Sequence, residues 1–138
     1  MTALTNAALS GVEVELFVSE QFDQFLVGHA QRSYYGPLLK AGVRIHLYRK
    51  PRMLHSKYMV VDGSLCIIGS SNMDVRSFGL NYEIVLVADS SRLVEMLHGN
   101  DERTREASRE LTYEEWRGQR GTSTTLTTCA DWGARSCE

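Results

Sequence analysis

A hairpin pattern in the middle of the chain sets the geometry of the residues around it. Residues 57–61 read Lys-Tyr-Met-Val-Val, which is rich in strand-forming side chains, and residues 65–68 form a second short apolar run. Between the two runs lies Asp62-Gly63, a residue pair typical of tight hairpin turns. The pattern therefore predicts two antiparallel strands joined by a short turn.

Polar side chains flank this hairpin at the end away from the turn. His55 and Lys57 are two residues apart on an extended segment, so both side chains leave the same face. The loop after the second strand returns beside them and carries Ser70 and Asn72. An imidazole, an ammonium, a hydroxyl and an amide would thus surround a volume that suits a phosphoryl group. The imidazole can attack phosphorus, and the other groups can bind its oxygens.

Glu83 lies eleven residues beyond Asn72, inside a segment from Tyr82 to Val87 that predicts a further strand. Its carboxylate could accept a hydrogen bond from the second ring nitrogen of His55 and so fix the tautomer of the ring. Each of these residues, taken alone, is most often an ordinary surface residue. The combination of six positions is much rarer, with a chance probability of about one in a million. Its residues are His55, Lys57, Asp62, Gly69, Ser70 and Asn72.

The rest of the chain predicts an α/β domain in which helices flank a mixed β-sheet. Alternating apolar residues indicate strands, and apolar residues at helical spacing indicate helices. The expected elements are a helix at 4–9, a strand at 12–18, a helix at 31–40, a strand at 43–47 and helical segments from 90 to 116. Gly99-Asn100 is expected to interrupt the last of these, and helical composition resumes at Asp101.

Composition limits the function classes. The chain has 138 residues and a net charge of -2, which fits one globular domain and excludes a globally basic nucleic-acid coat protein. No apolar stretch approaches the ~20 residues of a membrane span. Cys66, Cys129 and Cys137 form neither a disulfide framework nor a metal-ligand pattern, so no metal is predicted. The Ser/Thr-rich segment 118–138 is expected to be a disordered tail.

The spacing His55-x-Lys57-x4-Asp62-x6-Gly69-Ser70-x-Asn72 resembles the HKD motif of the phospholipase D superfamily. The flanking residues are similar to those of the C-terminal half of bacterial cardiolipin synthases. The flanks that carry this resemblance are Arg32 to Tyr35, Leu38 to Val43 and Asn72 to Glu83. The resemblance extends from about Asn6 to Arg117, so residues 1–117 are expected to form a phospholipase D-like domain, one half of a two-fold architecture.

The resemblance implies phosphatidyl transfer through a phosphohistidine, without a cofactor. It casts His55 as nucleophile or general acid, Glu83 as the residue that orients it, and Ser70 as a weaker phosphate contact than Lys57 or Asn72. Asp62 is attributed to the hairpin turn more readily than to catalysis. The predicted catalytic residues are His55, Lys57, Asp62, Asn72 and Glu83, and the predicted substrate-binding residues are Ser70, Lys57 and Asn72.

The family builds its site from two HKD motifs, whereas this chain has one. His29, His46 and His98 lack a lysine two residues further on. We therefore expect the chain to be the C-terminal half of a longer synthase, truncated at its N-terminus. The second half would come from the missing N-terminal region or from a homodimer.

The resemblance implies formation of cardiolipin from phosphatidylglycerol-type lipids. The expected partners are a phospholipid and a membrane surface, and no nucleic acid. The full-length protein would work at the cytoplasmic membrane, while this chain alone would be soluble or peripheral. Two alternatives stay open: a homodimeric, metal-independent phosphodiesterase, either nuclease or phospholipase D, and an inactive fragment. The net charge of -2 and the tyrosine-containing flank favour lipid transfer over nucleic-acid cleavage.

Overall fold

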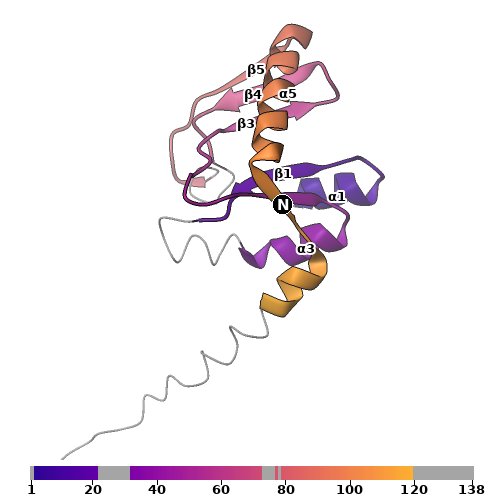
Figure 1. Cartoon of the computed structure of the whole chain (residues 1–138). Helices are drawn as coiled ribbons and strands as arrows, with labels where there is room; N and C mark the ends of the chain where they lie inside the picture. Colours follow the sequence, from indigo (N-terminus) through magenta and orange to yellow (C-terminus); the bar gives the residue numbers. More distant parts are fainter. Residues whose placement is uncertain (1, 22–31, 73–76, 78, 120–138) are drawn as a thin grey trace, which may run out of the picture.

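The structure, a computed structural model, describes residues 2–21, 32–72, 77 and 79–119. Two three-stranded sheets are flanked by helices, which confirms the predicted α/β class (Figure 1). The elements are α1 (Thr2–Leu9), β1 (Glu15–Ser19), α3 (Tyr35–Lys40), β2 (Arg44–Tyr48), β3 (Tyr58–Val61), β4 (Leu65–Gly69), β5 (Val85–Asp89), α5 (Ser91–Glu106) and β6 (Ser108–Leu111). Residues 113–119 add a final helical segment.

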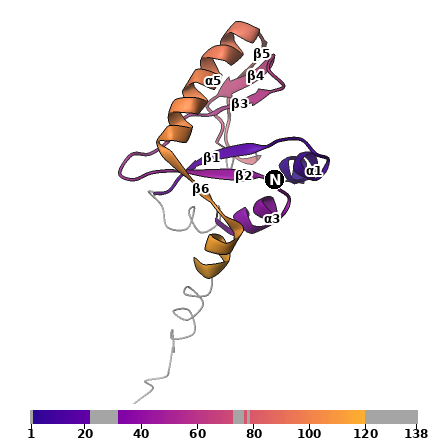
Figure 2. The same cartoon turned by 45° about the vertical axis from the view of Figure 1, so that its right-hand side comes forward.

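The first sheet has the order β1-β2-β6 and contains the main core. β1 runs parallel to β2, and β6 runs antiparallel to β2. Helices α1 and α3 and the final helical segment lie around this sheet (Figure 2). Its most buried side chains are Ile45 on β2 and Leu38 on α3. The predicted strands at 12–18 and 43–47 are present, although β1 begins only at Glu15. β2 is buried at three consecutive residues, Ile45 to Leu47, so it is covered on both faces and not half-buried as its alternation predicted.

The second sheet has the order β3-β4-β5, with all neighbours antiparallel. It contains the predicted hairpin, and the register pairs Val61 with Leu65 around the turn. Asp62 and Gly63 have φ angles of 49° and 74°, the left-handed region that aspartate tolerates and glycine favours. Cys66 on β4 is a buried free thiol. The turn residues thus form the turn that their identities predict.

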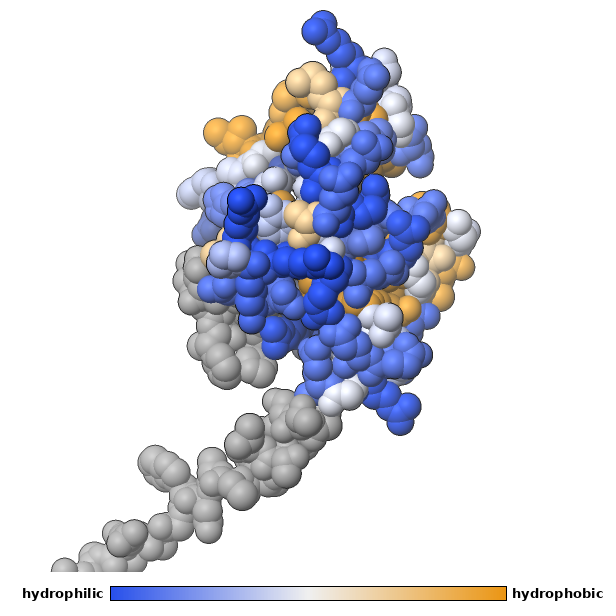
Figure 3. Space-filling model, viewed as in Figure 1, coloured by the Kyte–Doolittle hydropathy of each residue, from blue (hydrophilic) through white to orange (hydrophobic). Residues whose placement is uncertain are grey.

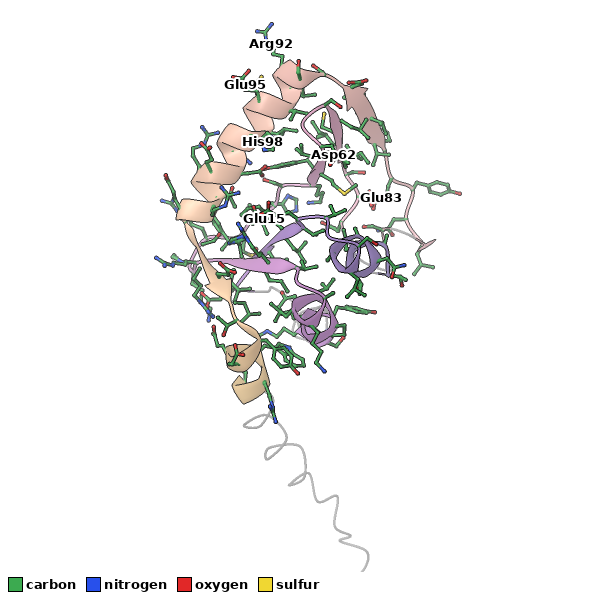
Figure 4. All side chains as sticks on the ribbon, turned by 90° about the vertical axis from the view of Figure 1, so that its right-hand side faces the viewer. Glu15, Asp62, Glu83, Arg92, Glu95 and His98 are labelled. Atoms are coloured by element: carbon green, nitrogen blue, oxygen red, sulfur yellow. The ribbon has the colours of Figure 1, made fainter. Side chains whose placement is uncertain are left out.

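Helix α5 connects the two sheets (Figure 2). On the hairpin side, the Tyr58 hydroxyl donates to Asp101 and accepts a 2.8 Å hydrogen bond from the Asn100 amide. Burial, together with the Asp101 bond, raises the pKa of Tyr58 to about 12. At the other end, Arg105 bonds Glu15 of β1 at 2.6 Å (Figure 4). These contacts hold β3 and β1 in a fixed relation, which matters because the predicted site lies beside both.

Three details differ from the sequence-based expectations. β5 begins at Val85, so Glu83 precedes the strand and does not lie within it. Helix α5 continues through Gly99-Asn100, because the helix is anchored there by the Asn100 contact with Tyr58. Residues 108–111 form a strand, since pairing with β2 and burial of Leu111 outweigh local helical propensity. The expected tail lies outside the described residues from 120 onward, and 118–119 still belong to the final helical segment.

Gly69 lies where β4 passes closest to the segment entering β5. A Cβ atom at this position would collide with the Ile84 carbonyl oxygen and the Val85 side chain. The first of these is backbone and cannot rotate away. Glycine is therefore required here by close approach of two chain segments.

We predict that Gly69→Ala destabilises the fold by about 1–3 kcal/mol, because the added methyl forces β4 and β5 apart. Gly79→Ala is the matched control, since a Cβ there meets no atom within 4 Å. It should change stability by less than about 0.5 kcal/mol. Chemical denaturation of both variants measures the difference. Equal stability of the two would contradict the close approach at Gly69.

Candidate active site

Two backbone hydrogen bonds join three chain segments at one end of the second sheet. Gly69 N donates to Lys57 O at 3.0 Å, and Ser70 N donates to Ile84 O at 3.0 Å. We call this end, opposite the Asp62-Gly63 turn, the open end of the hairpin. It gathers the segments that carry four of the predicted site residues, His55, Lys57, Ser70 and Glu83.

His55 and Lys57 are in direct contact at the open end. Lys57 Nζ lies 3.1 Å from His55 Nε2 and 3.1 Å from the His55 carbonyl oxygen. An ammonium group only donates, so Nε2 accepts and the ring proton is assigned to Nδ1. The His55 side chain is exposed. The lone pair at His55 Nε2 is thus held by the Lys57 ammonium on an exposed ring, and the two side chains lie together as expected from the two-residue spacing.

Ser70 and Glu83 form a second cluster next to this pair. The Ser70 hydroxyl donates to the Glu83 carboxylate and accepts a 3.1 Å hydrogen bond from Ile84 N. The Asn81 amide donates to the other Glu83 oxygen at 3.5 Å. The carboxylate is therefore positioned by Ser70 and Asn81. The sequence-based interpretation of Ser70 as a phosphate contact missed this bond, and it did not identify Asn81.

Asn72 follows Ser70 on the loop that leaves the open end. Its backbone N–H donates to the Ser77 hydroxyl at 3.1 Å, and Ser77 is buried. Its side chain is exposed. Ser77 is a second residue that sequence reasoning did not single out, although it belongs to the family-like flank Asn72 to Glu83. Binding of phosphate by the Asn72 amide stays a prediction.

Asp62 lies at the opposite end of the hairpin from His55 and Lys57. Asp62 is five residue steps of extended chain away from Lys57, a span of about 16 Å. Figure 4 shows Asp62 at the turn and Glu83 on the segment that enters β5. The structure therefore does not bring Asp62 together with the other predicted residues, and its left-handed φ accounts for its place in the turn.

The segment before His55 is tied to the first sheet. Leu54 N donates to the Ser19 hydroxyl at 2.8 Å, and that hydroxyl lies 3.4 Å from the Leu54 carbonyl oxygen. Ser19 is the last residue of β1. The open end of the hairpin is thus placed beside the carboxyl end of a strand that is parallel to its neighbour, the edge at which α/β proteins commonly bind ligands.

Other candidate groups lie elsewhere. His46 is buried on β2 and stacks on Phe17 at 4.8 Å, and burial lowers its pKa. His98 lies on α5 beside Asp101. Among residues 2–21, 32–72, 77 and 79–119, no three His, Cys, Asp or Glu side chains are grouped so that they could hold a metal ion. Within the same ranges, no helix has the length and apolarity to cross a bilayer.

Comparison with known proteins supports a common origin for this arrangement. The family model described as "Cardiolipin synthase, PLD-like domain" matches residues 1–103. A cardiolipin synthase from Geobacillus thermodenitrificans is 52% identical over 84 residues, which are 61% of this chain and 16% of that protein. The probable cardiolipin synthase YwiE from Bacillus subtilis is 40% identical over 110 residues, 80% of this chain and 22% of that protein.

The chain thus spans roughly a fifth of the length of these relatives, between 16% and 22%. Among solved structures, Nuc from Salmonella typhimurium, a phospholipase D family member, superimposes with a TM-score of 0.69. The match has 20% sequence identity and covers 80% of this chain and 72% of Nuc. This likeness shows the fold. The match to the family model over residues 1–103 establishes that the chain belongs to the phospholipase D-like domain family of cardiolipin synthases.

Proposed function

We propose that this chain is the segment of a cardiolipin synthase that carries one HKD motif, and that it takes part in phosphatidyl transfer between two phosphatidylglycerol-type lipids. The observation that carries the proposal is the 3.1 Å contact between His55 Nε2 and Lys57 Nζ at an exposed position. Membership of a cardiolipin synthase family supports a lipid as substrate. The full-length protein would then work at the cytoplasmic membrane, where its substrates are.

In the first proposed step, the Lys57 ammonium turns from His55 Nε2 to a non-bridging oxygen of a phosphatidyl donor, and the Nε2 lone pair that it releases attacks the phosphorus. A P–N bond forms, the P–O bond to the headgroup alcohol breaks, and that alcohol receives a proton from the histidine of a second HKD motif. Lys57 and Asn72 bind the non-bridging oxygens, where their positive charge and amide hydrogens stabilise the extra negative charge of the transition state.

In the second step, a hydroxyl of the acceptor lipid attacks the phosphohistidine. The new P–O bond forms as the P–N bond breaks, and the second histidine takes the hydroxyl proton. Glu83 would orient the His55 ring, and its bonds to Ser70 and Asn81 support that role because they fix the carboxylate at the open end. One diester replaces another, so the proposed exchange needs no external oxidant or reductant.

A second phospholipase D-type half is the partner that this site requires. Members of this family pair two such domains. Large apolar side chains beside Glu83 are strongly exposed, with Tyr82 at 107%, Ile84 at 83% and Leu80 at 77%. Leu86 and Val87 on β5 are also exposed. Figure 3 shows hydrophobic residues gathered at the end of the molecule occupied by the β3-β4-β5 sheet.

Consecutive apolar residues along a strand are typical of strands covered on both faces, and exposed patches of this kind mark interaction surfaces. We propose that the second half docks on Leu80, Tyr82 and Ile84. It would thereby bring its histidine to the site. Either the same polypeptide or another copy would supply the second half, and the docking surface is the same in both cases.

We predict that His55→Asn, in the protein assembled with its second half, lowers cardiolipin formation by a factor on the order of 10³ or more, because the nucleophile is lost. The assay measures cardiolipin made from phosphatidylglycerol vesicles, and mass spectrometry locates a phosphoryl label on residue 55. Asp62→Asn should keep activity within about threefold, since asparagine accepts the left-handed turn conformation.

Undiminished cardiolipin formation by His55→Asn would contradict the assignment of His55 as the nucleophile. A strong loss of cardiolipin formation in Asp62→Asn, with the fold intact, would show that Asp62 takes part in catalysis. Cleavage of DNA without cardiolipin formation would favour the homodimeric nuclease over lipid transfer.

We predict that Ile84→Lys prevents assembly with the second half, because a buried, unpaired charge would lie in the interface. Sedimentation of the chain alone, and of the chain mixed with a separately expressed second half, measures assembly. Met96→Lys is the matched control, since Met96 is an apolar residue that is 65% exposed and lies on α5, outside the segment proposed to dock. Assembly that survives Ile84→Lys unchanged would contradict the proposed docking surface.

A further inference from the structure

A cavity of about 340 Å³ lies at the carboxyl ends of β1 and β2. Ser19 contributes from the end of β1, Glu20 is the residue after it, and Lys50 lies in the segment after β2. Tyr35 of α3, Arg109 of β6 and Trp116 of the final helical segment enclose the rest. Figures 1 and 2 both show α3 and the final helical segment on the same side of the β1-β2-β6 sheet. None of the residues that carry the proposed chemistry lines this cavity.

The cavity is nevertheless connected to the candidate active site. Ser19 lines the cavity, and its hydroxyl accepts the 2.8 Å hydrogen bond from Leu54 N. Leu54 precedes His55, so the wall residue Ser19 is joined to His55 by this hydrogen bond and one further Cα–Cα step of about 3.8 Å. A small molecule in the cavity could therefore direct one end towards His55.

The charged side chains in and around the cavity differ in whether they form ion pairs. Arg109 is held by two carboxylates, Glu20 at 2.9 Å and Glu115 at 2.8 Å. Lys50 is exposed and forms no ion pair with any other described residue. Arg32, whose carbonyl accepts a 3.3 Å bond from Trp116 Nε1, adds a further positive charge to the lining. Lys50 therefore offers its positive charge to a ligand, which favours an anionic group at this side of the cavity.

The remaining lining groups are suited to hydroxyls. The Glu20 carboxylate and the Ser19 hydroxyl can exchange hydrogen bonds with a polyol, and Tyr35 and Trp116 offer apolar ring surface to a short carbon chain. The volume lies at the small end of the range for ligand sites. It fits a polar headgroup better than an acyl chain.

We propose that this cavity, the headgroup pocket, binds the phosphoglycerol headgroup of the acceptor lipid. Its phosphate would lie at Lys50, and its terminal hydroxyl would point past Ser19 towards the phosphorus on His55. The proposal rests on the proposed function and names the class of acceptor that the site selects. The pocket would decide whether a bound lipid or water resolves the phosphohistidine.

The first test measures product partition in the assembled protein. Transfer to phosphatidylglycerol gives cardiolipin, whereas transfer to water gives phosphatidic acid. Lys50→Ala should lower the ratio of cardiolipin to phosphatidic acid about tenfold and raise the KM for the acceptor, the effect of losing one charge-assisted hydrogen bond. Arg52→Ala is the matched control, since Arg52 is an exposed cation of the same segment that does not line the cavity. It should leave the ratio unchanged.

A second measurement separates failure of this proposal from failure of the proposed function. Sn-glycerol 3-phosphate is titrated onto the 138-residue chain, with the Trp116 indole NMR signal as readout, and inorganic phosphate and glycerol as comparators. Saturable binding of glycerol 3-phosphate, stronger than either comparator and weakened by Lys50→Ala, supports the pocket even if no lipid transfer is detected. An unchanged product ratio in Lys50→Ala overturns the proposal, and so does inorganic phosphate binding as tightly as glycerol 3-phosphate.

Discussion

The site depends on the two backbone hydrogen bonds that close the open end of the hairpin, from Gly69 N to Lys57 O and from Ser70 N to Ile84 O. They align three segments that are distant in sequence, so the His55–Lys57 pair and the Ser70–Glu83 pair lie at one edge of one sheet. Gly69 makes this alignment possible, because any side chain there would meet the Ile84 carbonyl. Glycine is thus required at position 69 by packing, and this packing keeps the candidate site residues at one edge of the sheet.

The same edge is also the meeting point of the two sheets. Helix α5 holds them through Tyr58 at the hairpin and Arg105 at β1, and Ser19 attaches the segment before His55 to the end of β1. The proposed catalytic groups and the proposed headgroup pocket consequently share one framework. The apolar surface beside Glu83 is exposed, as expected if a second half docks there.

Much of this could be predicted from sequence. The hairpin, its turn and the His55–Lys57 contact follow from a period of two and from turn residues, which are local signals. Tertiary contacts outweighed local signals at two places. Residues 108–111 have helical composition but form a strand because they pair with β2. Helix α5 continues through Gly99, where the neighbouring Asn100 contacts Tyr58. The Ser70–Glu83 bond and the headgroup pocket join residues 13 or more positions apart, and no spacing rule indicates such contacts.

A crystal structure of the assembled protein with orthovanadate, a mimic of the pentacoordinate phosphoryl group, tests the central claim most directly. The account predicts vanadium bonded to His55 Nε2, with Lys57 Nζ within hydrogen-bonding distance of an equatorial oxygen. Vanadate bound away from His55, or bound equally well by His55→Asn, would contradict it.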